Sequence, residues 1–360
     1  MIAARDLMRR SENEPAKELA PIPSDAPGPG ERMRRRDFIA GLSGATLAWP
    51  LKSVAQQTDQ LRRIGILSPF SKAAMTGASY RGLLDGLRNL GYVEGRSLAI
   101  EWRFANNDFQ RLPALVAELV NAKVEVIVTQ STPAVSAASK ATKRIPIVAL
   151  TVGDPVGSGF AASLARPGGN VTGTVVLGEV LSAKRLELLA ELAPSVSRVA
   201  VLINPDNAYS RRTIPEIKAL TEKSGKEIVV IYAHNLSELN EGLSGLVRQR
   251  LRAFIVTDDP FFLGNDARIV EIALQAKLIS IFPWSQSVEA GGLLSYSIDY
   301  VTEARRLASY VDQILKGARP GELPFQRPEK FQLTVNLKTA RAIGITVPQS
   351  IIGRADRVIE

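Results

Sequence analysis

The chain has 360 residues, of which 45% are hydrophobic and 22% charged, and its formal net charge is +9. This length and composition are typical of a globular protein with two domains of ordinary size. The sequence contains no cysteine and a single histidine, His234. The lack of cysteine excludes disulfides, thiolate metal sites and a Cys nucleophile, and one histidine disfavours His-based triads and metal clusters. We therefore expect no metal and no cofactor.

The excess of positive charge raises the question of nucleic-acid binding. Lysines and arginines are, however, scattered along the predicted helices with acidic residues among them, and no basic run beyond the N-terminal one is interleaved with aromatic residues. Nucleic-acid-binding proteins concentrate such charge on one face. We interpret the charge as a solvated basic surface and expect no nucleic-acid partner.

Residues 1–33 combine five prolines with several charges and show no apolar periodicity. This composition predicts a disordered extension rather than a domain. Met33 directly precedes the next signal in the chain, so translation can also begin at that residue.

Residues 34–55 have the pattern of an export signal. Arg35 and Arg36 are followed by one spacer, Phe38 and a mild apolar run, and a small-x-small site ends at Ala55. This pattern resembles a twin-arginine signal peptide with cleavage after Ala55. The apolar run is too short to span a bilayer, which needs about 20 residues. We expect export to the periplasm by the twin-arginine route; the alternative is a basic arm that leads into an amphipathic helix.

From Arg62 onward short apolar runs alternate with amphipathic stretches, which indicates a wound α/β domain with a parallel sheet. The expected strands of this first half are 63–68, 97–104, 124–129, 145–152 and 171–177. Its expected helices are 79–90, 108–122, 133–143 and a short one at 161–165.

The alternation then restarts, which predicts a second α/β half that faces the first. Its expected strands are 198–203, 227–232, 253–257 and 278–282. Its expected helices are 180–192, 213–224, 236–250 and 265–276. The last part does not continue this half cleanly, with expected strands 291–296 and 331–337 and helices 301–316 and 338–343. A C-terminal segment that passes between two domains creates several crossings and therefore a hinge.

The stretch 124–160 is the strongest candidate for a binding site in the first half. Parallel strands point their carboxyl ends to one edge of the sheet, so residues 130–132 and 153–155 are expected to lie together there. Thr132 is predicted to cap the following helix, with Pro133 at its first position. Free N–H groups at such a helix end favour an anion, for example a ligand carboxylate. The alternative is an ordinary capped helix followed by a Gly/Pro turn.

Several segments between Arg62 and Glu360 carry a family likeness. They include, in chain order, RRIGILSPF, GLRNLGYVEGRSLAIEWRFA, DPVGSGF, LARPGGNVTG, KRLELLAELAPSVSRVAVLINPDN and EAGGLLSYSIDY. DPVGSGF and LARPGGNVTG together are rather specific, whereas either segment alone is weak. With these segments the chain resembles the ABC-transporter substrate-binding family that includes tryptophan- and tyrosine-binding proteins.

The resemblance implies the type I periplasmic binding protein architecture, in which two Rossmann-like, flavodoxin-like parallel-sheet lobes are joined by a three-crossing hinge. It places 60–171 and 295–323 in lobe I, and 172–294 and 324–360 in lobe II. It also implies a binding protein rather than an enzyme, one that captures a small molecule in the inter-lobe cleft and delivers it to an ABC transporter permease in the inner membrane. We expect a monomer whose ligand is an amino acid, with an aromatic one favoured.

If the strand ends of both lobes face the cleft, the polar turns after the strands supply the ligand contacts. In the first half these candidates are Ser68, Phe70, Gln130, Ser131, Thr132, Gly153 and Asp154. Ser131 and Thr132 can bind a carboxylate, and Asp154 can accept a ligand ammonium. Phe70 can form an apolar wall. The alternatives are loop packing for Phe70 and a turn carboxylate satisfied by nearby N–H groups for Asp154.

The remaining candidates lie in the second half and near an expected crossing. They are Asn204, Asp258, Ser295 and Tyr296. Asn204 can hydrogen-bond polar ligand atoms or form an Asx turn, and Asp258 lies directly at a strand end. Ser295 and Tyr296 lie beside the crossing, where Tyr296 can stack on a ligand or belong to the hinge core. Asp259, which precedes a proline, is attributed to turn chemistry.

An aromatic wall for the ligand is not evident in the sequence. No aromatic residue follows Asn204 directly, and the nearest is Tyr209. Trp284 and Trp102 can serve as walls, or as core residues because both lie in or beside predicted strands. An aromatic ligand is therefore a hypothesis.

Two other classes of function remain open. One is an extracytoplasmic sensor module that uses the same fold to signal to a membrane kinase. The other is an α/β enzyme, such as a racemase or hydrolase, that uses the carboxylates of Asp154 and Asp258. A permease and ATPase gene pair nearby would favour the binding protein, a kinase gene the sensor, and turnover of a substrate the enzyme.

Overall fold

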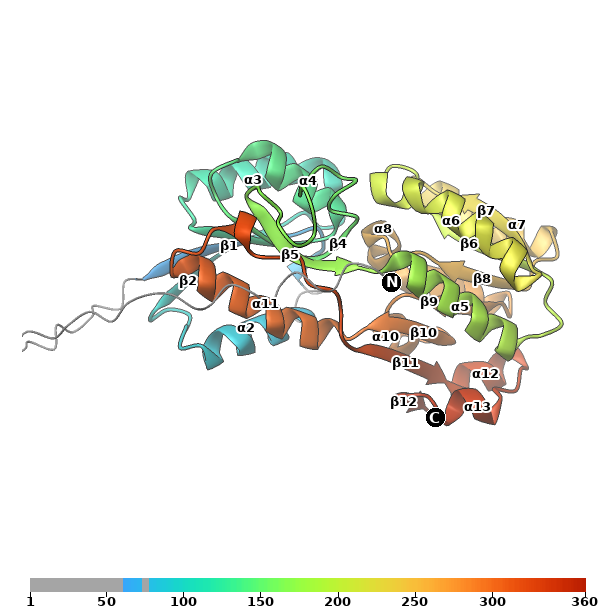
Figure 1. The fold of residues 1–360 in the computed structure, drawn as a ribbon. Coiled ribbons are helices and arrows are strands. Elements are labelled where there is room, and N and C mark those ends of the chain that lie inside the picture. Colours follow the sequence, from blue (N-terminus) through green and yellow to red (C-terminus); the bar gives the residue numbers. More distant parts are fainter. Residues whose placement is uncertain (1–60, 73–77) are drawn as a thin grey trace, which may run out of the picture. The chain divides into compact units, whose positions relative to one another are not determined.

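The computed structural model describes residues 61–72 and 78–360. The predicted extension over 1–33 and the predicted export signal over 34–55 lie outside these residues. The described residues form one compact unit, and its strands make two sheets (Figure 1). The sheet of five strands has the order β2-β1-β3-β4-β5, and the sheet of seven has the order β12-β11-β10-β9-β8-β6-β7. We call each sheet with its flanking helices the first and the second lobe.

The first sheet is parallel throughout. Its strands are rich in Ile, Val and Leu, which suits a sheet covered on both faces. Because β1 lies between β2 and β3, the connections leave β1 and β3 toward opposite sides, and the switch point of the topology lies between these two strands. The strands are β1 (Arg62–Ser68), β2 (Leu98–Phe104), β3 (Val126–Gln130), β4 (Ile147–Gly153) and β5 (Val171–Val176).

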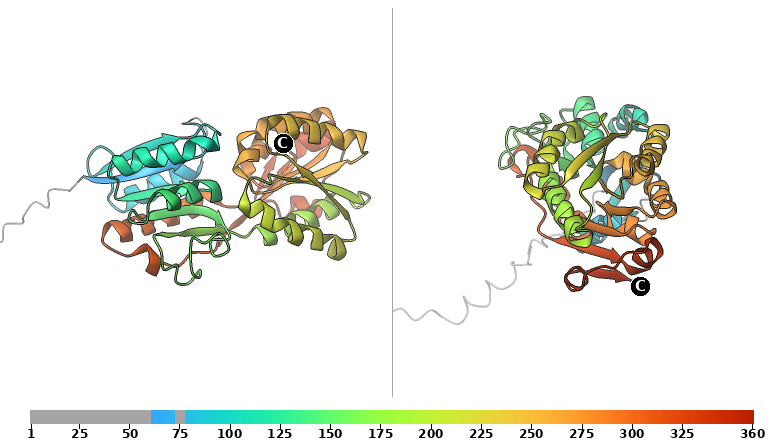
Figure 2. Two further views of the ribbon diagram at one scale, coloured as in Figure 1. Left: turned by 90° about the horizontal axis from the view of Figure 1, so that it is seen from above. Right: turned by 90° about the vertical axis from the view of Figure 1, so that its right-hand side faces the viewer.

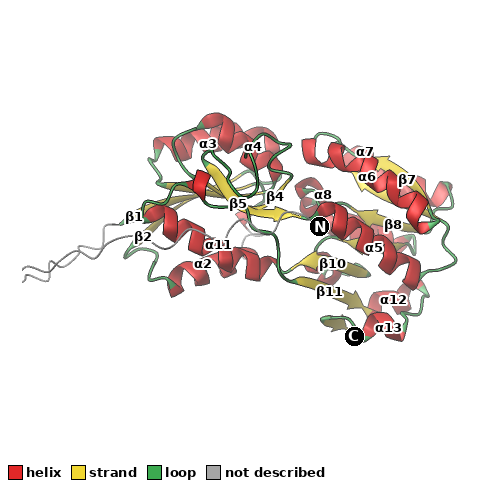
Figure 3. Cartoon of the chain, viewed as in Figure 1, coloured by secondary structure: helices red, strands yellow, loops and turns green. Residues whose placement is uncertain are grey.

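Side chains of the first sheet alternate between two cores, as the two-residue period of a strand requires. Ile64 and Ile66 pack with α2 and α11 on one face, whereas Leu67 and Ile127 pack with α3 and α4 on the other. Figure 3 shows these helices on both faces of the sheet. The helices are α2 (Ala78–Asn89), α3 (Leu112–Asn121) with the preceding 3₁₀ turn η1 (Phe109–Arg111), α4 (Thr132–Ala141) and α11 (Tyr300–Leu315).

The second sheet repeats the same order and then extends it. Strands β7-β6-β8-β9-β10 match β2-β1-β3-β4-β5, so a second switch point lies between β6 and β8. β11 is antiparallel to β10, and β12 is parallel to β11. The strands are β6 (Arg198–Ile203), β7 (Glu227–Tyr232), β8 (Ala253–Val256), β9 (Ile279–Phe282), β10 (Leu294–Ile298), β11 (Phe331–Asn336) and β12 (Arg357–Ile359).

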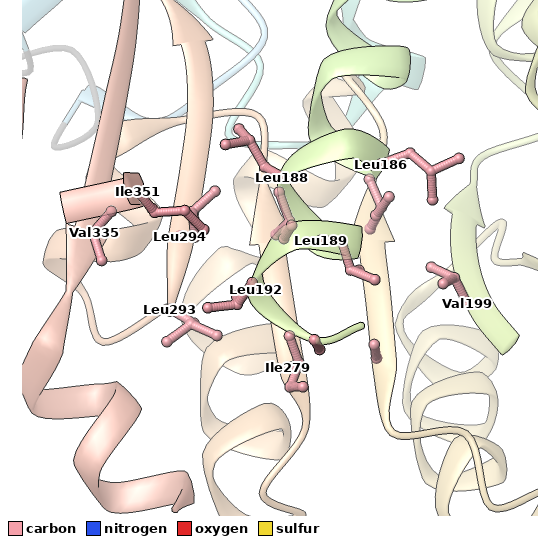
Figure 4. Close-up of a cluster of buried hydrophobic side chains, with 14 of the residues drawn as sticks. Leu186, Leu188, Leu189, Leu192, Val199, Ile279, Leu293, Leu294, Val335 and Ile351 are labelled. Carbon is pink, nitrogen blue, oxygen red and sulfur yellow. The ribbon is translucent and has the colours of Figure 1, made fainter. Parts of the chain in front are cut away.

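Two groups of helices cover the second sheet. Leu186, Leu189 and Leu192 of α5 pack against strand residues such as Val199 and Ile279 on one face (Figure 4). The other face packs against α7 and α9. The helices of this lobe are α5 (Gly178–Leu192), α6 (Ala208–Ser224), α7 (Leu236–Arg248), α8 (Pro260–Gly264), α9 (Asp266–Gln275), α10 (Ser285–Glu289), α12 (Leu337–Ile343) and α13 (Gln349–Ile352). No helix in the described part of the chain is both long and apolar enough to cross a membrane.

The chain passes between the lobes three times. It crosses between β5 and α5, between β10 and α11, and between η2 (Pro320–Glu322) and β11. α11 thereby returns to the first lobe beside α2, although more than 200 residues of chain separate them. Figure 2 shows the last strands, in red, with the second lobe.

The predicted lobe boundaries differ from these crossings in three places. The boundary between residues 171 and 172 falls inside β5, which pairs with β4 in the first sheet. Residues 295–298, expected in lobe I, belong to β10 of the second sheet. Gln326, expected in lobe II, bridges Thr174 of the first sheet. Each strand completes its hydrogen bonds before the chain crosses, because leaving backbone groups unpaired in a buried strand is costly.

Two helix predictions are also wrong: one helix is absent, and the other begins earlier than expected. The short helix expected at 161–165 is not formed. The helix expected from Thr213 begins at Ala208, because the side chain of Asn207 accepts a hydrogen bond from the N–H of Tyr209 and caps the helix. Pro215 lies inside α6. The extra turn matters, since it carries residues that contact the first lobe.

Candidate functional site

A cavity of about 290 Å³ is lined by residues of both lobes. It lies at the carboxyl ends of β1 and β3 in the first sheet and of β6 and β8 in the second, which are the two switch points. Ligands bind at this edge of open α/β sheets because helix N-termini and unpaired strand ends meet there. The volume is at the low end of the range of about 300–1,000 Å³ for small-molecule sites. This size suits a ligand as small as an amino acid.

The amino end of α4 forms the wall of the first lobe. Ser131 is the N-cap and adopts a φ of +72°, and its Oγ is buried without a hydrogen-bond partner among the described residues. The expected cap, Thr132, instead lies in the first turn, and its Oγ1 accepts a hydrogen bond from the Gly153 N–H at 3.0 Å. The cap prediction is therefore one residue off. The Thr132 hydroxyl holds β4 against α4, and Ser131 is left to face a ligand.

Strained backbone continues along this wall. Thr151 lines the cavity with a φ of +53°, at the point where the register of β4 against β5 shifts. Its N–H donates to the Oγ1 of Thr174 at 2.9 Å, which stabilises the irregular strand. Positive φ is unfavourable for a β-branched residue, and such strain is common at ligand sites. No residue pattern in β4 indicates this shift of register, so the sequence did not predict Thr151 as a site residue.

In the second lobe, Asp258 lines the cavity and pairs with a buried arginine. The Asp258 carboxylate contacts Arg185 in a bidentate arrangement, with N–O distances of 2.5 and 3.0 Å. Arg185 is fully buried, and its Nε donates to the carbonyl of Tyr296 at 3.0 Å. Arg185 lies on α5 after the first crossing, and Tyr296 on β10 before the second. One guanidinium thus ties a cavity carboxylate to two hinge segments.

Asp259 organises the neighbouring turns. It is fully buried and accepts hydrogen bonds from Asn204, Asn207 and Ser210 at 3.1, 2.7 and 3.2 Å. The N–H of Phe261 also donates to it, as expected of turn chemistry before a proline. Burial raises the pKa of Asp259, although these donors oppose the shift. Because its oxygens are occupied by the protein, Asp259 positions the turns after β6 and β8.

Asp266, at the start of α9, is the lining carboxylate with the fewest compensating contacts. It accepts hydrogen bonds from the Ala267 N–H at 2.8 Å and the Ser287 hydroxyl at 3.2 Å. No ion pair to Asp266 is formed by the residues that the structure describes. Burial therefore raises its pKa above the ordinary value of 3.8. A ligand cation would supply the missing charge.

This raised pKa predicts a pH-dependent stability. The folded state binds the Asp266 proton more tightly than the unfolded state, so its contribution to stability is full below the unfolded pKa and is lost as pH rises through the folded pKa. Asp266→Asn removes the ionisable group and therefore the loss of stability that its deprotonation causes. In urea titrations without ligand, the variant should gain stability relative to the wild type as the pH rises above the ordinary aspartate value of 3.8. Asp85→Asn on the exposed face of α2 is the control, and an equal gain there would contradict the assignment.

Aromatic side chains enclose the rest of the cavity. The lining aromatic residues are Phe70, Tyr80, Tyr209, Trp284 and Tyr300. The Trp284 Nε1–H donates to the Tyr300 hydroxyl at 3.1 Å, which fixes both rings. Burial raises the pKa of Tyr209 and Tyr300, and the Asp258 carboxylate adds to the shift, so both hydroxyls remain protonated. Trp102 does not line the cavity, because it packs between Tyr80 and Phe104.

Two glycines allow close contact between the lobes. A Cβ on Gly153 would lie 2.3 Å from the Tyr209 ring, and one on Gly264 would lie 2.6 Å from the Asn107 side chain. In each pair one residue belongs to the first lobe and the other to the second, and all four line the cavity. The lobes can approach this closely at both points only because Gly153 and Gly264 have no side chain.

The hinge itself contributes to the lining. Val176, Asp299 and Gln332 line the cavity, and each comes from a different crossing. Asp299 also caps α11 by accepting from the N–H groups of Val301 and Thr302, both at 3.1 Å. The cavity is therefore lined in part by the segments that connect the lobes. Sequence reasoning missed all three, because no local pattern shows where a crossing passes.

The predicted site residues divide into two groups. Those that line the cavity are Phe70, Gln130, Ser131, Thr132, Gly153 and Asp258. Those that do not line it are Ser68, Asp154, Asn204, Ser295 and Tyr296. In the second group, Ser68, Asp154 and Asn204 lie at strand ends as expected, whereas Ser295 and Tyr296 lie inside β10.

Specific contacts explain this second group. Ser68 accepts the N–H of Phe70 at 3.1 Å. Asn204 forms an Asx turn with Asp206 at 3.0 Å, one of the two roles considered from the sequence. Ser295 is fully buried within β10. Tyr296 stacks on Phe331 with ring centroids 5.9 Å apart, which places it in the hinge core.

Asp154 does not line the cavity and instead forms an ion pair with Arg212. Its Oδ2 lies 3.3 Å from the Nε of Arg212, which belongs to the second lobe. Its Oδ1 accepts the N–H of Gly157 at 2.8 Å, as the turn interpretation predicts. Residues 208–212 at the start of α6, which include Arg212, were not expected to be helical, so this partner was not foreseen.

The charge of the lining is acidic. The charged residues that line the cavity are Asp258, Asp259, Asp266 and Asp299. No Lys, Arg or His of the described chain joins them in the lining. Within residues 61–72 and 78–360, no group of three or more His, Cys, Asp or Glu side chains could hold a metal ion. The site can bind a small molecule through a helix end, carboxylates and aromatic rings.

Two lobes that share the order of five parallel strands, three crossings and a ligand-sized cavity at both switch points define a type I periplasmic binding protein. Residues 63–359 match the family model described as ABC transporter substrate binding protein. The chain therefore belongs to the ABC transporter substrate-binding family.

Known relatives agree with this assignment. The chain is 29% identical over 264 residues to the tyrosine-binding protein of Clostridioides difficile strain R20291. The aligned region covers 73% of this chain and 75% of that protein. It superposes with a TM-score of 0.78 and 28% identity on a conserved domain protein from Vibrio cholerae. It also resembles an ABC domain from Streptococcus pneumonia in complex with L-Trp, with a TM-score of 0.77 and 26% identity. Both structures cover 83% of this chain and are themselves covered completely.

Membership confirms several expectations. The fold class is the predicted one, and the chain is a binding protein rather than an enzyme. The family implies a small-molecule ligand, an ABC permease as partner and a location outside the cytoplasm.

Proposed function

We propose that the protein is the solute-binding component of an ABC importer and that it captures an aromatic amino acid, which it delivers to the permease. The observation that carries the proposal is the composition of the cavity. A free helix end and an unpartnered hydroxyl lie on one lobe, a carboxylate without an ion pair among the described residues lies on the other, and aromatic rings line the space.

The carboxylate of the ligand would bind at the amino end of α4. Ser131 contributes its Oγ, and the first N–H groups of the helix point toward the same end, where the helix dipole favours negative charge. Because no cationic side chain lines the cavity in the described chain, the helix end is the main source of positive potential for an anion.

The ammonium of the ligand would pair with Asp266. Asp258 is neutralised by Arg185, Asp259 accepts several protein donors, and Asp299 caps α11. Asp266 has only two neutral donors, and its raised pKa reflects a charge that the protein does not balance. Asp266 thus takes the role that the sequence suggested for Asp154.

The aromatic preference is supported by the rings of Phe70, Trp284 and Tyr300, which offer flat apolar surfaces, and by the hydrogen bond that fixes the Tyr300 hydroxyl. Two relatives point the same way, since one is a tyrosine-binding protein and one was solved with L-Trp.

A panel of matched ligands tests the proposal. L-Tryptophan, L-tyrosine and L-phenylalanine are compared with L-leucine, with tryptamine, which lacks the carboxylate, and with indole-3-propionate, which lacks the ammonium. An aromatic amino acid should raise the melting temperature most, because a ligand at 100 times its Kd stabilises the folded state by about 2.7 kcal/mol. Ser131→Ala and Asp266→Asn should weaken its binding in calorimetry. Stronger stabilisation by leucine, or equal stabilisation by a truncated analogue, would refute the proposed ligand.

We further propose that residues 34–55 direct export by the twin-arginine route, with cleavage after Ala55, and that the mature protein is a monomer in the periplasm. The paired arginines support the route. Mass spectrometry of the exported protein checks the cleavage site, and light scattering checks the monomer.

A further inference from the structure

The first two turns of α6, in the second lobe, reach across to the first lobe. Tyr209 packs on Gly153 at the wall of the cavity. Arg212 follows three residues later, so it lies on the same side of the helix. Arg212 does not line the cavity, and it contacts residues 154–158 of the first lobe outside it.

The guanidinium of Arg212 uses each of its nitrogens in this contact. Nε lies 3.3 Å from the Oδ2 of Asp154. Nη2 donates to the Oγ of Ser158 at 2.6 Å, and Nη1 donates to the carbonyl of Gly157. A planar fork with several donors suits a group of acceptors held in fixed positions, which a lysine cannot match. One side chain therefore joins the second lobe to three residues of the first.

The loop that receives Arg212 is already shaped for it. Asp154 has a φ of +37°, and its Oδ1 accepts the N–H of Gly157 at 2.8 Å. The Ser158 N–H donates to the Asp154 carbonyl at 2.9 Å. A Cβ on Gly157 would lie 2.0 Å from the Asp154 Oδ2, so a side chain there would displace the carboxylate. A loop held in this way loses little conformational freedom when it binds the arginine.

The surrounding charges also favour the contact. Burial and the carboxylates of Glu179 and Asp154 raise the pKa of Glu216, which lies one turn after Arg212 on α6. The carboxylates of Glu179, Asp154 and Glu216 therefore make this region negative, which favours the positive charge of Arg212. The side chains of Arg212 and Asp154 are 38% and 42% exposed, so salt can screen their attraction.

We propose that Arg212 is a positioning residue that raises ligand affinity from outside the cavity. Its contacts with residues 154–158, which we call the clasp, hold the two lobes together and slow the release of the ligand. A ligand enclosed by both lobes leaves only after the contacts between the lobes break. The free energy of this clasp therefore adds to the binding of any ligand that both lobes contact. The inference rests on the solute-binding role, not on the aromatic nature of the ligand.

Binding kinetics with L-tryptophan test the clasp. Arg212→Ala should raise the dissociation rate and the Kd about 5- to 10-fold, with a smaller change in the association rate. Arg212→Lys should restore part of the affinity, because it keeps the charge but not the fork. Asp154→Asn keeps an acceptor for the Gly157 N–H, and its effect should not add to that of Arg212→Ala. The difference between Arg212→Ala and the wild type should shrink at high salt.

Arg211 provides the matched control. It neighbours Arg212 on α6, but its Nη1 donates to the Pro205 carbonyl within the second lobe. Arg211→Ala should leave the Kd unchanged. The proposal is wrong if Arg212→Ala changes the Kd less than about 2-fold, or if Arg211→Ala has the same effect.

Failure of the ligand assignment can be separated from failure of the clasp. If L-tryptophan does not bind the wild type, the proposed ligand is wrong, and the clasp is judged from lobe distances without ligand. The chain has no cysteine, so Ala117→Cys on α3 and Glu241→Cys on α7, both exposed, can carry one spin label each. Arg212→Ala should shift the measured distances to longer values than in the wild type. Identical distance distributions would overturn the clasp.

Discussion

Replacing Gly153 with alanine is expected to raise the Kd for the ligand about 10- to 100-fold. The added Cβ would lie 2.3 Å from the ring of Tyr209, a residue that is 8% exposed and whose hydroxyl end lies against Gly178. Overpacking of this kind costs about 1–3 kcal/mol, and each 1.4 kcal/mol is a factor of about ten in binding. The strain arises only when the lobes are in contact, so the cost falls on ligand binding.

Calorimetry and thermal unfolding together distinguish this effect from a folding defect. The φ of Gly153 is not in the left-handed region, so alanine fits the backbone, and the melting temperature without ligand should stay close to that of the wild type. Gly245→Ala in α7 is the control, because its Cβ would meet only side-chain ends at 3.5 Å or beyond. In a Tyr209→Ala background the penalty of Gly153→Ala should shrink. A penalty of the same size there would show that the clash with Tyr209 is not its cause.

Replacing Arg185 with methionine is expected to lower the free energy of unfolding by about 3–5 kcal/mol, the usual cost of breaking a buried ion pair from one side. Arg185 is fully buried and the Asp258 side chain is 8% exposed, so the carboxylate would lose its counter-charge where little water can replace it. The carbonyl of Tyr296 would lose its donor as well. Urea denaturation measures the loss.

The double variant Arg185→Met/Asp258→Asn separates the charge from the packing. It should recover much of the lost stability, since a neutral amide costs less to bury than an unpaired carboxylate. Lys184→Met on the same helix is the control, because the Lys184 side chain is 38% exposed and its ion pair among the described residues is with Glu187. A loss below about 1 kcal/mol for Arg185→Met would mean that water or a rearranged group balances Asp258.

The fold could be anticipated because its signals are local. Apolar runs bounded by polar turns mark buried strands, and amphipathic stretches mark the covering helices. The same rule placed Phe70, Ser131 and Asp258 at strand ends, where they line the cavity. It also placed Asn204 there, but that side chain turns back to serve its own loop and Asp259.

The parts of the site that escaped the sequence depend on distant segments. Arg185 lies in the middle of a leucine-rich helix, and only the return of β8 beside α5 shows that it neutralises Asp258. Asp154 has the local pattern of a ligand carboxylate, yet the start of α6 brings Arg212 to it. Neither pairing has a signal within either segment, because the partners meet only after both lobes are built.

The sequence by itself determined two α/β halves, their strand-end turns and the family, because these depend on periodicity, turn chemistry and segments that are contiguous in the chain. The tertiary structure alone decided where the chain crosses between the lobes and which side chains face the cavity. It also decided which charges are balanced within the protein and which, like that of Asp266, are left for a ligand. Burial and pairing are properties of the whole packed chain, and a charge is expensive or useful only according to what surrounds it.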